Sequence, residues 1–349
     1  MPVLLNPKIE IVHPKILALK QQLDRVIVEH DAIKLRLILA ILAGQHVLIE
    51  STPGQGKTML VKTLQNCISG TNSARVQGTP DLTPNSVLGF EVYDPKKAEF
   101  VTRTGPLIGA HFLLYDEANR AAPRTNSATL QAMQEKQVTI GGVTYDLEQL
   151  FLVMATINPI EQEGTYTLPE AMLDRFCFKL EMKNISRAGE IELLRRTAVH
   201  QQGAMSLLDR PPVSGEEMLA YRKEVEEIAE NVPDEIRGYV IDCNRATRPV
   251  ADGGTLEDLD LRAHSHFAGE IRYGVSPRAG ISVLHTAAAL AFVSGRRYVT
   301  VDDVKAVIPD CFRHRIILNY VPQPDDTTIS DLIATILDAE VGVPLIEVA

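Results

Sequence analysis

The chain has 349 residues, 45% of them hydrophobic and 23% charged, which is the composition of an ordinary globular protein. Lysine and arginine number 35 against 45 aspartate and glutamate residues, so the net charge of −10 argues against a protein held on nucleic acid by bulk electrostatic attraction. Because a single hydrophobic core stops growing at roughly 250–300 residues, two structural units are expected.

Features that would direct the chain out of a reducing compartment are not found. The four cysteines are widely spaced and form no C-x-x-C pair, which predicts buried, reduced thiols. The amino-terminal residues carry no basic region ahead of an apolar core, so no secretion signal is expected. The apolar stretch 281–293 is too short to span a bilayer. We therefore expect a cytoplasmic protein with no membrane insertion.

The first expected elements are helices within 14–43, a buried strand at 47–49 and a helix at 59–67. A glycine-rich loop joins that strand to that helix, which is the context of a phosphate-binding loop and disfavours a chance Gly-Lys-Thr. Ser51 stands where the pattern G-x-x-x-x-G-K-S/T has its first glycine. The glycines let backbone N–H groups face a polyphosphate, while Lys57 offers a charge and Thr58 a ligand for Mg²⁺. The predicted nucleotide contacts are Pro53, Gly54, Gln55, Gly56, Lys57, Thr58 and Met59.

The next segments predict a short strand at 74–77, a capped helical turn at 86–89 and a hairpin with strands at 90–93 and 99–102. A buried strand then ends in the paired carboxylates Asp116 and Glu117. Ligands of open α/β sheets bind beyond the carboxyl ends of the strands. There Asp116 would hold Mg²⁺ through water, and Glu117 would polarise the attacking water. Taken alone, this pair is equally a solvated turn, but together with Lys57 it predicts an NTPase.

A helix at 120–136, a Gly-Gly hairpin at 138–145 and a strand at 151–157 follow. Asn158 comes directly after this strand, where it would either orient the hydrolytic water or form an Asn-Pro turn. Farther along, Arg175 precedes a last strand at 177–181. This arginine is expected either in a salt bridge near Asp174 or facing the phosphates of a neighbouring subunit.

From residue 186 onward strand signals vanish and helices are expected, over 188–199, 215–231, 234–247, 277–294, 300–307 and 329–339. The boundary between an α/β core (1–183) and a helical domain (184–349) is therefore placed near Lys183. Residues 249–272 form a polar insertion. It contains His264 and His266, which are interpreted as part of an exposed loop because no third metal ligand lies at a fixed spacing.

Over nearly its whole length the chain resembles the MoxR family of AAA+ ATPases. The segments that carry the resemblance occur in family order from residue 8 to the carboxyl terminus: 53–58, 79–82, 105–106, 116–121 (Asp-Glu-Ala-Asn-Arg-Ala), 130–135, 158–159, 161–164, 168–171, 174–176, 276–278 (Ser-Pro-Arg) and 297–300. The departures are Ser51, Glu29-His30 in place of a Gly-Gln near the adenine, and Met172 in place of a glutamine. The first two bear on nucleotide affinity.

The resemblance implies an α/β fold: an AAA+ P-loop core with a parallel sheet and a C-terminal all-helical lid domain. It also implies a homo-oligomeric ring, expected to be a hexamer, with ATP hydrolysis between subunits and Mg²⁺ held by Thr58 and Asp116. The hairpin near 90–103 corresponds to the family's helix-2 insert. Asn158 would be sensor 1 and Arg175 the arginine finger, while Arg278 would be sensor 2, reaching the γ-phosphate of its own subunit from the lid.

Members of this family act as chaperone-like motors that remodel or mature protein complexes, often with a von Willebrand factor A-domain partner. We expect such a partner and a protein client for this chain. Two alternatives are a nucleic-acid motor of the helicase type and the motor subunit of a metal chelatase. The net charge, the lack of a recognisable DNA-binding domain and the presence of only Lys96 and Lys97 at the hairpin tip disfavour the nucleic-acid motor.

Overall fold

The computed structural model describes residues 9–158, 166, 168–199, 204–248, 271–319 and 329–338. By packing, the chain forms two compact units: Pro14–Met172 with Leu180–Tyr221, and Met1–His13 with Leu173–Lys179 and Arg222–Ala349. Each unit contains more than one segment of the chain, so the division differs from a single domain boundary near Lys183. The assignment of 1–183 to the core and 184–349 to the lid therefore stays a prediction about domain organisation.

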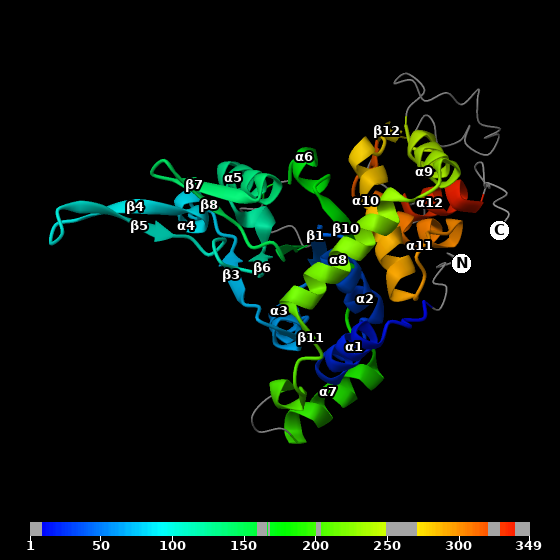
Figure 1. Cartoon of the computed structure of the whole chain (residues 1–349), viewed down its shortest axis with the longest axis horizontal. Helices are drawn as coiled ribbons and strands as arrows, with labels where there is room; N and C mark the ends of the chain where they lie inside the picture. Colours follow the sequence, from blue (N-terminus) through cyan, green and yellow to red (C-terminus); the bar gives the residue numbers. More distant parts are fainter. Residues whose placement is uncertain are drawn as a thin grey trace. The chain divides into compact units, whose positions relative to one another are not determined.

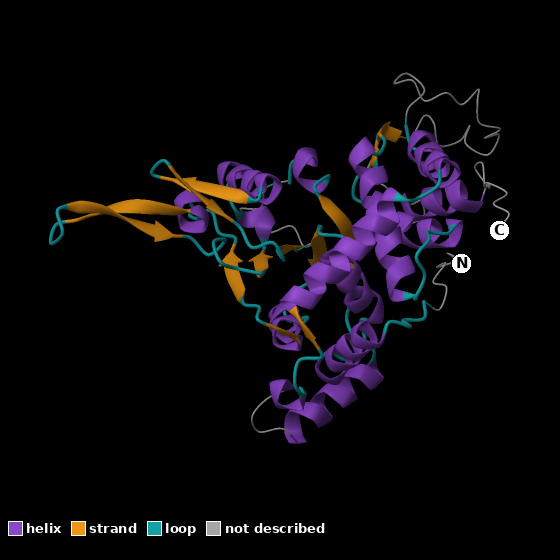
Figure 2. Ribbon diagram, viewed as in Figure 1, coloured by secondary structure: helices purple, strands orange, loops and turns teal. Residues whose placement is uncertain are grey.

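A five-stranded sheet has the order β10-β1-β9-β6-β3, and all of it except residues 176–179 of β10 belongs to the first unit. Its strands are among those drawn in orange in Figure 2. The strands are β1 (His46–Ser51), β3 (Ser73–Gln77), β6 (Phe112–Asp116), β9 (Leu152–Ile157) and β10 (Phe176–Met182). The pairs β1–β9, β9–β6 and β6–β3 are parallel. All residues of β6 are buried, as expected for a strand covered on both faces. The predicted parallel α/β sheet is confirmed.

Helices of this unit are α1 (Pro14–Val26), α2 (Asp31–Leu42), α3 (Lys57–Cys67), α4 (Pro84–Leu88), α5 (Pro123–Glu135), α6 (Glu170–Leu173, whose last residue lies in the other unit), α7 (Arg187–Val199) and the first part of α8 (Gly215–Glu230). Short 3₁₀ turns occur at Ala118–Arg120 and Ala204–Leu207. The expected helical stripe Ile16, Leu19 and Leu23 of α1 is fully buried, which is why this helix packs on the core. Among the described residues, no helix combines the length and the apolarity needed to cross a bilayer.

Two hairpins extend from the first unit at the places where the sequence predicts them (Figure 1). Strands β4 (Gly89–Asp94) and β5 (Glu99–Thr104) pair antiparallel, and so do β7 (Gln137–Ile140) and β8 (Val143–Asp146). Gly141 and Gly142 both have positive φ, at 56° and 82°, as a two-residue hairpin turn requires. The β7–β8 hairpin therefore follows from local turn chemistry.

The second unit is mainly helical, with the rest of α8, α9 (Asp234–Ala246), α10 (Pro277–Val293), α11 (Val301–Phe312) and α12 (Ile329–Asp338). Thr300 and Asp303 form a reciprocal capping box that fixes the start of α11. This helix continues past its expected end at residue 307, through Pro309. Most of the 249–272 insertion, including His264 and His266, lies outside the described residues.

The expectation that strands vanish after residue 186 is wrong in detail. A two-stranded antiparallel pair joins β12 (Ile271–Tyr273) to β13 (Ile317–Leu318). In the first unit, β2 (Ile68–Ser69) pairs in parallel with β11 (Val213–Ser214). These pairings involve two or three residues each, which is too short for an alternating hydrophobic pattern to appear in the sequence.

Candidate functional site

The glycine-rich loop joins the end of β1 to the start of α3. Gly54 and Gly56 both have φ of +86°, and Gly56 directly precedes the first helical residue, Lys57. A Cβ atom at either glycine would have no heavy atom within 4 Å, so the left-handed conformation rather than crowding calls for glycine. The first N–H groups of α3 have no partner within the helix and point to the loop, which makes this end suited to a phosphate group.

Asp116 ends β6 and is surrounded by three hydrogen-bonding or charged groups of the same unit. Its Oδ1 lies 3.6 Å from Lys57 Nζ and accepts a hydrogen bond from Thr156 Oγ1 at 2.7 Å, while Oδ2 lies 2.7 Å from Arg75 Nη2. Burial alone would raise the pKa of Asp116. The bonds from Thr156 and Arg75 and the charge of Lys57 outweigh burial and lower it. This carboxylate is therefore ionised near neutral pH and aimed at the loop lysine.

Glu117 follows in a left-handed conformation, with φ of 53°. Its N–H donates to Thr156 Oγ1 at 2.9 Å, and its Oε2 accepts from Gln77 Nε2 at 3.1 Å and from Arg120 Nη1 at 3.0 Å. Gly78 passes so close that a Cβ there would lie 2.1 Å from the Glu117 carbonyl oxygen. Glu117 is thus held at the carboxyl end of β6, next to Asp116.

Asn158 directly follows β9, and its carbonyl accepts a hydrogen bond from Asn119 Nδ2 at 3.5 Å. The register pairs Tyr115 of β6 with Ala155 of β9 and Glu50 of β1 with Ile157 of β9. The loop, the acid pair and Asn158 therefore all follow the carboxyl ends of adjacent parallel strands, where α/β sheets bind ligands.

A second cluster surrounds Asp174 in the other compact unit. Asp174 Oδ1 is 3.0 Å from Arg315 Nε and accepts a hydrogen bond from Ser276 Oγ at 2.7 Å, while Oδ2 is 3.5 Å from Arg278 Nη1. Arg175 Nε is buried without a hydrogen-bond partner among the described residues. Burial and the nearby charge of Arg278 lower the pKa of Arg175. The structure thus brings Arg175 and Arg278 together around Asp174. Their expected division, Arg175 toward a neighbour and Arg278 toward its own subunit, stays a prediction.

Sequence reasoning missed four side chains that organise these clusters: Arg75, Gln77, Thr156 and Arg315. The first two lie on β3, whose register places Gln77 opposite Asp116. A polar residue near the end of the strand next to an acid-bearing strand is the signal that could have identified them. Arg315 lies 141 positions beyond Asp174, and no local pattern connects the two.

Near the expected adenine segment, two consecutive non-glycine residues adopt the left-handed conformation. Glu29 has φ of 56° and His30 has φ of 57°. For residues with a Cβ this conformation costs about 1–2 kcal/mol each. The Glu29 carboxylate accepts hydrogen bonds from the N–H of Ser186, at 2.9 Å, and from its hydroxyl, and these bonds hold the turn. Contacts with the segment before α7 therefore stabilise this turn.

The side chains of the first cluster suit a Mg²⁺ ion bound together with phosphate oxygens and water better than a metal ion held by protein side chains alone. Within the described ranges, no group of three or more His, Cys, Asp or Glu side chains is placed to hold a metal ion. Mg²⁺ is usually bound by one or two carboxylates together with phosphate oxygens and water. Asp116 provides such a carboxylate, and the hydroxyl of Thr58, the residue after Lys57, is a further oxygen ligand for Mg²⁺ in a phosphate-binding loop.

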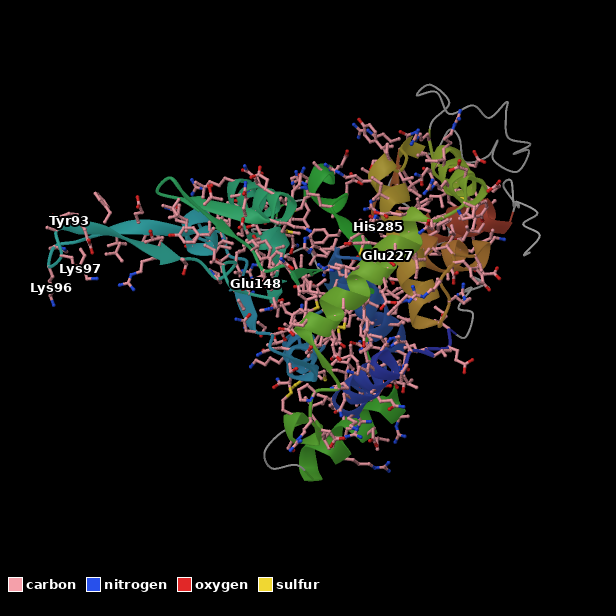
Figure 3. All side chains as sticks on the ribbon, in the orientation of Figure 1. Tyr93, Lys96, Lys97, Glu148, Glu227 and His285 are labelled. Atoms are coloured by element: carbon pink, nitrogen blue, oxygen red, sulfur yellow. The ribbon has the colours of Figure 1, made fainter. Side chains whose placement is uncertain are left out.

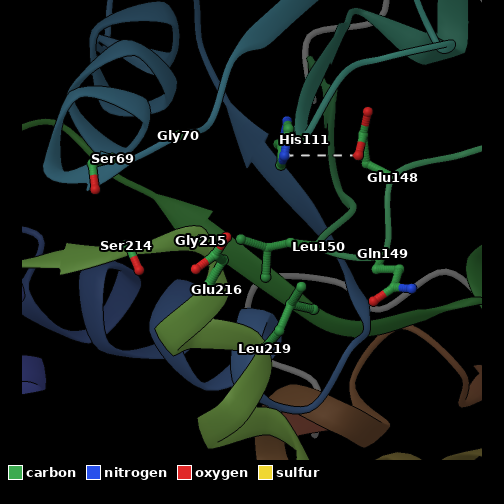
Figure 4. Close-up of a pocket in the computed structure, with 10 residues that line it drawn as sticks. All are labelled: Ser69, Gly70, His111, Glu148, Gln149, Leu150, Ser214, Gly215, Glu216 and Leu219. Atoms are coloured by element: carbon green, nitrogen blue, oxygen red, sulfur yellow. Dashed lines mark ion pairs between the residues drawn. The ribbon is translucent and has the colours of Figure 1, made fainter.

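A separate cavity of about 550 Å³ lies at the opposite, amino-terminal ends of β6 and β9 (Figure 4). His111, just before β6, and Glu148 both line the cavity, and His111 Nε2 lies 3.9 Å from Glu148 Oε2. Glu216 and Leu219 of α8 line the other side. Its lining contains none of the loop or acid-pair residues, so it is not part of the predicted nucleotide site.

Two profiles of known protein families match the chain. Residues 46–178 match the ATPase family associated with various cellular activities, and residues 264–336 match an AAA lid domain. The first match contains the loop, the acid pair, Asn158 and Arg175. The second contains Arg278 and Arg315.

Named proteins and a solved structure are similar over most of the chain. Chaperone MoxR1 of Mycobacterium tuberculosis is 39% identical over 90% of this chain and 79% of that protein. The uncharacterized protein YeaC of Bacillus subtilis is 37% identical over 89% of both. The crystal structure of a candidate ATPase from Cytophaga hutchinsonii has 37% identity and a TM-score of 0.81, with 93% of each chain covered.

Proposed function

Because the chain belongs to the MoxR family of AAA+ ATPases, we propose that it hydrolyses ATP to drive the remodelling or maturation of protein complexes. One observation carries the proposal: Lys57 of the loop lies 3.6 Å from Asp116, and Glu117 is the next residue. A phosphate-binding charge, a metal-binding carboxylate and a water-activating carboxylate are the three groups that NTP hydrolysis needs in one place.

Each residue then has a separate task. The N–H groups of the loop and Lys57 bind the phosphates, and Met59 with the other loop residues contacts the nucleotide. Asp116 and Thr58 would hold Mg²⁺, which supplies charge to the β- and γ-phosphates. Glu117 polarises the attacking water, which Asn158 helps to orient. Before it can do so, Glu117 must exchange its hydrogen bonds from Gln77 and Arg120 for a bond to water.

The site is completed by a neighbouring subunit in a homo-oligomeric ring, in which the Arg175 of that neighbour contacts the γ-phosphate. Arg278 acts on the nucleotide of its own subunit. The match of residues 46–178, which include Arg175, to the ATPase family supports this role of Arg175. The expected ring is a hexamer. A cytoplasmic location is proposed because the enzyme needs ATP.

The β4–β5 hairpin supports a protein rather than a nucleic acid as the partner. Phe100 is 67% exposed and Tyr93 is 51% exposed, and their rings pack edge to face at 5.5 Å. Lys96 and Lys97 are the cations at the hairpin tip (Figure 3), and Lys97 Nζ lies 4.0 Å from Glu99. Exposed aromatic side chains are typical of protein interfaces, whereas nucleic-acid grooves need more positive charge. A von Willebrand factor A-domain protein and a protein client are the proposed partners.

Two substitutions test the proposed ATPase. Lys57→Ala removes the charge that binds the phosphates, so nucleotide binding should be lost. Glu117→Gln keeps the shape of the side chain and should retain binding while turnover falls at least about a hundredfold. Binding is measured with a fluorescent ADP analogue and turnover by phosphate release. Near-normal turnover in Glu117→Gln would contradict the assignment, and a protein co-purifying with this variant in ATP would identify the client.

A further inference from the structure

Arg75 is the side chain at the site whose role the proposed ATPase leaves open. It projects from β3, and its Nη2 is 2.7 Å from Asp116 Oδ2. Its side chain is 51% exposed, whereas that of Lys57 is only 10% exposed. Arg75 is therefore the cation at Asp116 that can leave without disturbing the core.

Asp116 does not need Arg75 to keep its orientation. Thr156 Oγ1 donates to Oδ1 at 2.7 Å from the adjacent strand β9, and the same threonine oxygen accepts the N–H of Glu117. This threonine is fully buried. The carboxylate is thus fixed from one side by Thr156 and covered from the other by a removable positive charge.

The same guanidinium group also connects the two acids. Arg75 Nη2 donates to Gln77 Oε1 at 2.5 Å, and Gln77 Nε2 donates to Glu117 Oε2. One continuous chain of hydrogen bonds therefore runs from Asp116 through Arg75 and Gln77 to Glu117. If Arg75 moves away from Asp116, the oxygen of Gln77 loses its hydrogen-bond donor.

We propose that Arg75 competes with Mg²⁺ for Asp116 and thereby sets the Mg²⁺ concentration at which the site binds nucleotide with its metal. The inference rests on the proposed function, because it assumes that Asp116 serves Mg²⁺ bound with a nucleotide. Arg75 occupies one oxygen of the carboxylate, and its charge repels a divalent cation at the other. A neighbouring positive charge typically changes the proton affinity of a carboxylate by roughly 10- to 1,000-fold, and its affinity for a metal cation falls for the same reason.

The test measures metal-dependent nucleotide binding rather than turnover. Binding of N-methylanthraniloyl-ADP to the full chain is followed as free Mg²⁺ is titrated at constant ionic strength. Arg75→Ala and Arg75→Gln should each lower the Mg²⁺ midpoint about tenfold relative to the wild type. The glutamine variant keeps most of the side-chain volume, so it serves if the alanine variant is poorly folded.

Two controls separate charge from other causes. Arg75→Lys keeps a positive charge beside Asp116, so its Mg²⁺ midpoint should stay within about twofold of the wild type. Arg124→Ala removes an exposed arginine of α5 and should behave in the same way. An unchanged or higher midpoint in both Arg75→Ala and Arg75→Gln would overturn the inference, as would an equal fall in Arg75→Lys. Failure of the wild type to bind the nucleotide at any Mg²⁺ concentration would instead overturn the proposed function.

Discussion

The two clusters of functional side chains differ in their balance of charge. In the loop cluster, Asp116 and Glu117 are both in contact with cations, and each carboxylate has at least one hydrogen bond of 3.0 Å or less. In the arginine cluster, Asp174 alone faces Arg278 and Arg315, and Arg175 stands beside them. In the proposed function the loop cluster holds the metal and the attacking water, and the arginine cluster adds positive charge toward the phosphates. Both clusters contain cations, but only the loop cluster has two adjacent carboxylates.

The largest effect is expected at Arg175. Arg175→Ala should lower turnover about 10³-fold or more, because an arginine that stabilises transition-state charge contributes this much in NTPases. Nucleotide binding should change less than about tenfold, since the loop supplies the ground-state contacts. Parallel measurements of phosphate release and of nucleotide binding separate the two. A normal rate would show that Arg175 does not take part in catalysis.

Within the same cluster, Asp174 should matter for stability. Arg315 is only 2% exposed in its side chain, and Asp174 Oδ1 is 3.0 Å from its Nε. Asp174→Ala leaves this buried charge without its carboxylate, which typically costs about 3–5 kcal/mol. Arg278→Ala is the matched control, because its side chain is 49% exposed and its ion pair with Asp174 should contribute less than about 1 kcal/mol. Urea unfolding of both variants tests the difference. Equal losses would mean that Asp174 does not serve mainly to neutralise Arg315.

The smallest effect is expected at Ser51, in the first cluster. Ser51 is 2% exposed, and its Oγ has no hydrogen-bond partner among the described residues. Ser51→Ala should therefore raise the free energy of unfolding by about 1 kcal/mol, since a buried unpaired hydroxyl carries a desolvation cost. Ser51 is the last residue of β1, three positions before Gly54, so nucleotide affinity should change less than about threefold. A large loss of affinity would mean that the hydroxyl itself contacts the nucleotide.

The sequence predicted the elements whose patterns are local and missed the contacts made across the fold. The glycines of the loop, the apolar run before Asp116 and the Gly-Gly turn each specify a conformation within a few residues, and all three elements form as expected. The contacts of Arg75 and Gln77 with the two acids depend on β3 lying beside β6, and no local sequence pattern predicts the order of strands in a sheet. Arg315, three residues after the end of α11, bonds to Asp174 across 141 positions of the chain, a separation that no spacing rule predicts.

The central claim is that the loop cluster of one subunit works with the Arg175 of its neighbour. Mixing two inactive variants, Lys57→Ala and Arg175→Ala, tests it directly, after the ring has been allowed to exchange subunits. In a ring assembled at random from equal amounts of the two variants, about a quarter of all subunit interfaces combine an intact Lys57 with an intact neighbouring Arg175. The parallel mixture of Lys57→Ala with Arg278→Ala should stay inactive, and recovery there would place Arg278 in the neighbour's site beside Arg175. For the first mixture the account predicts ATPase activity well above the sum of the separate variants, and activity no higher than that sum would contradict it.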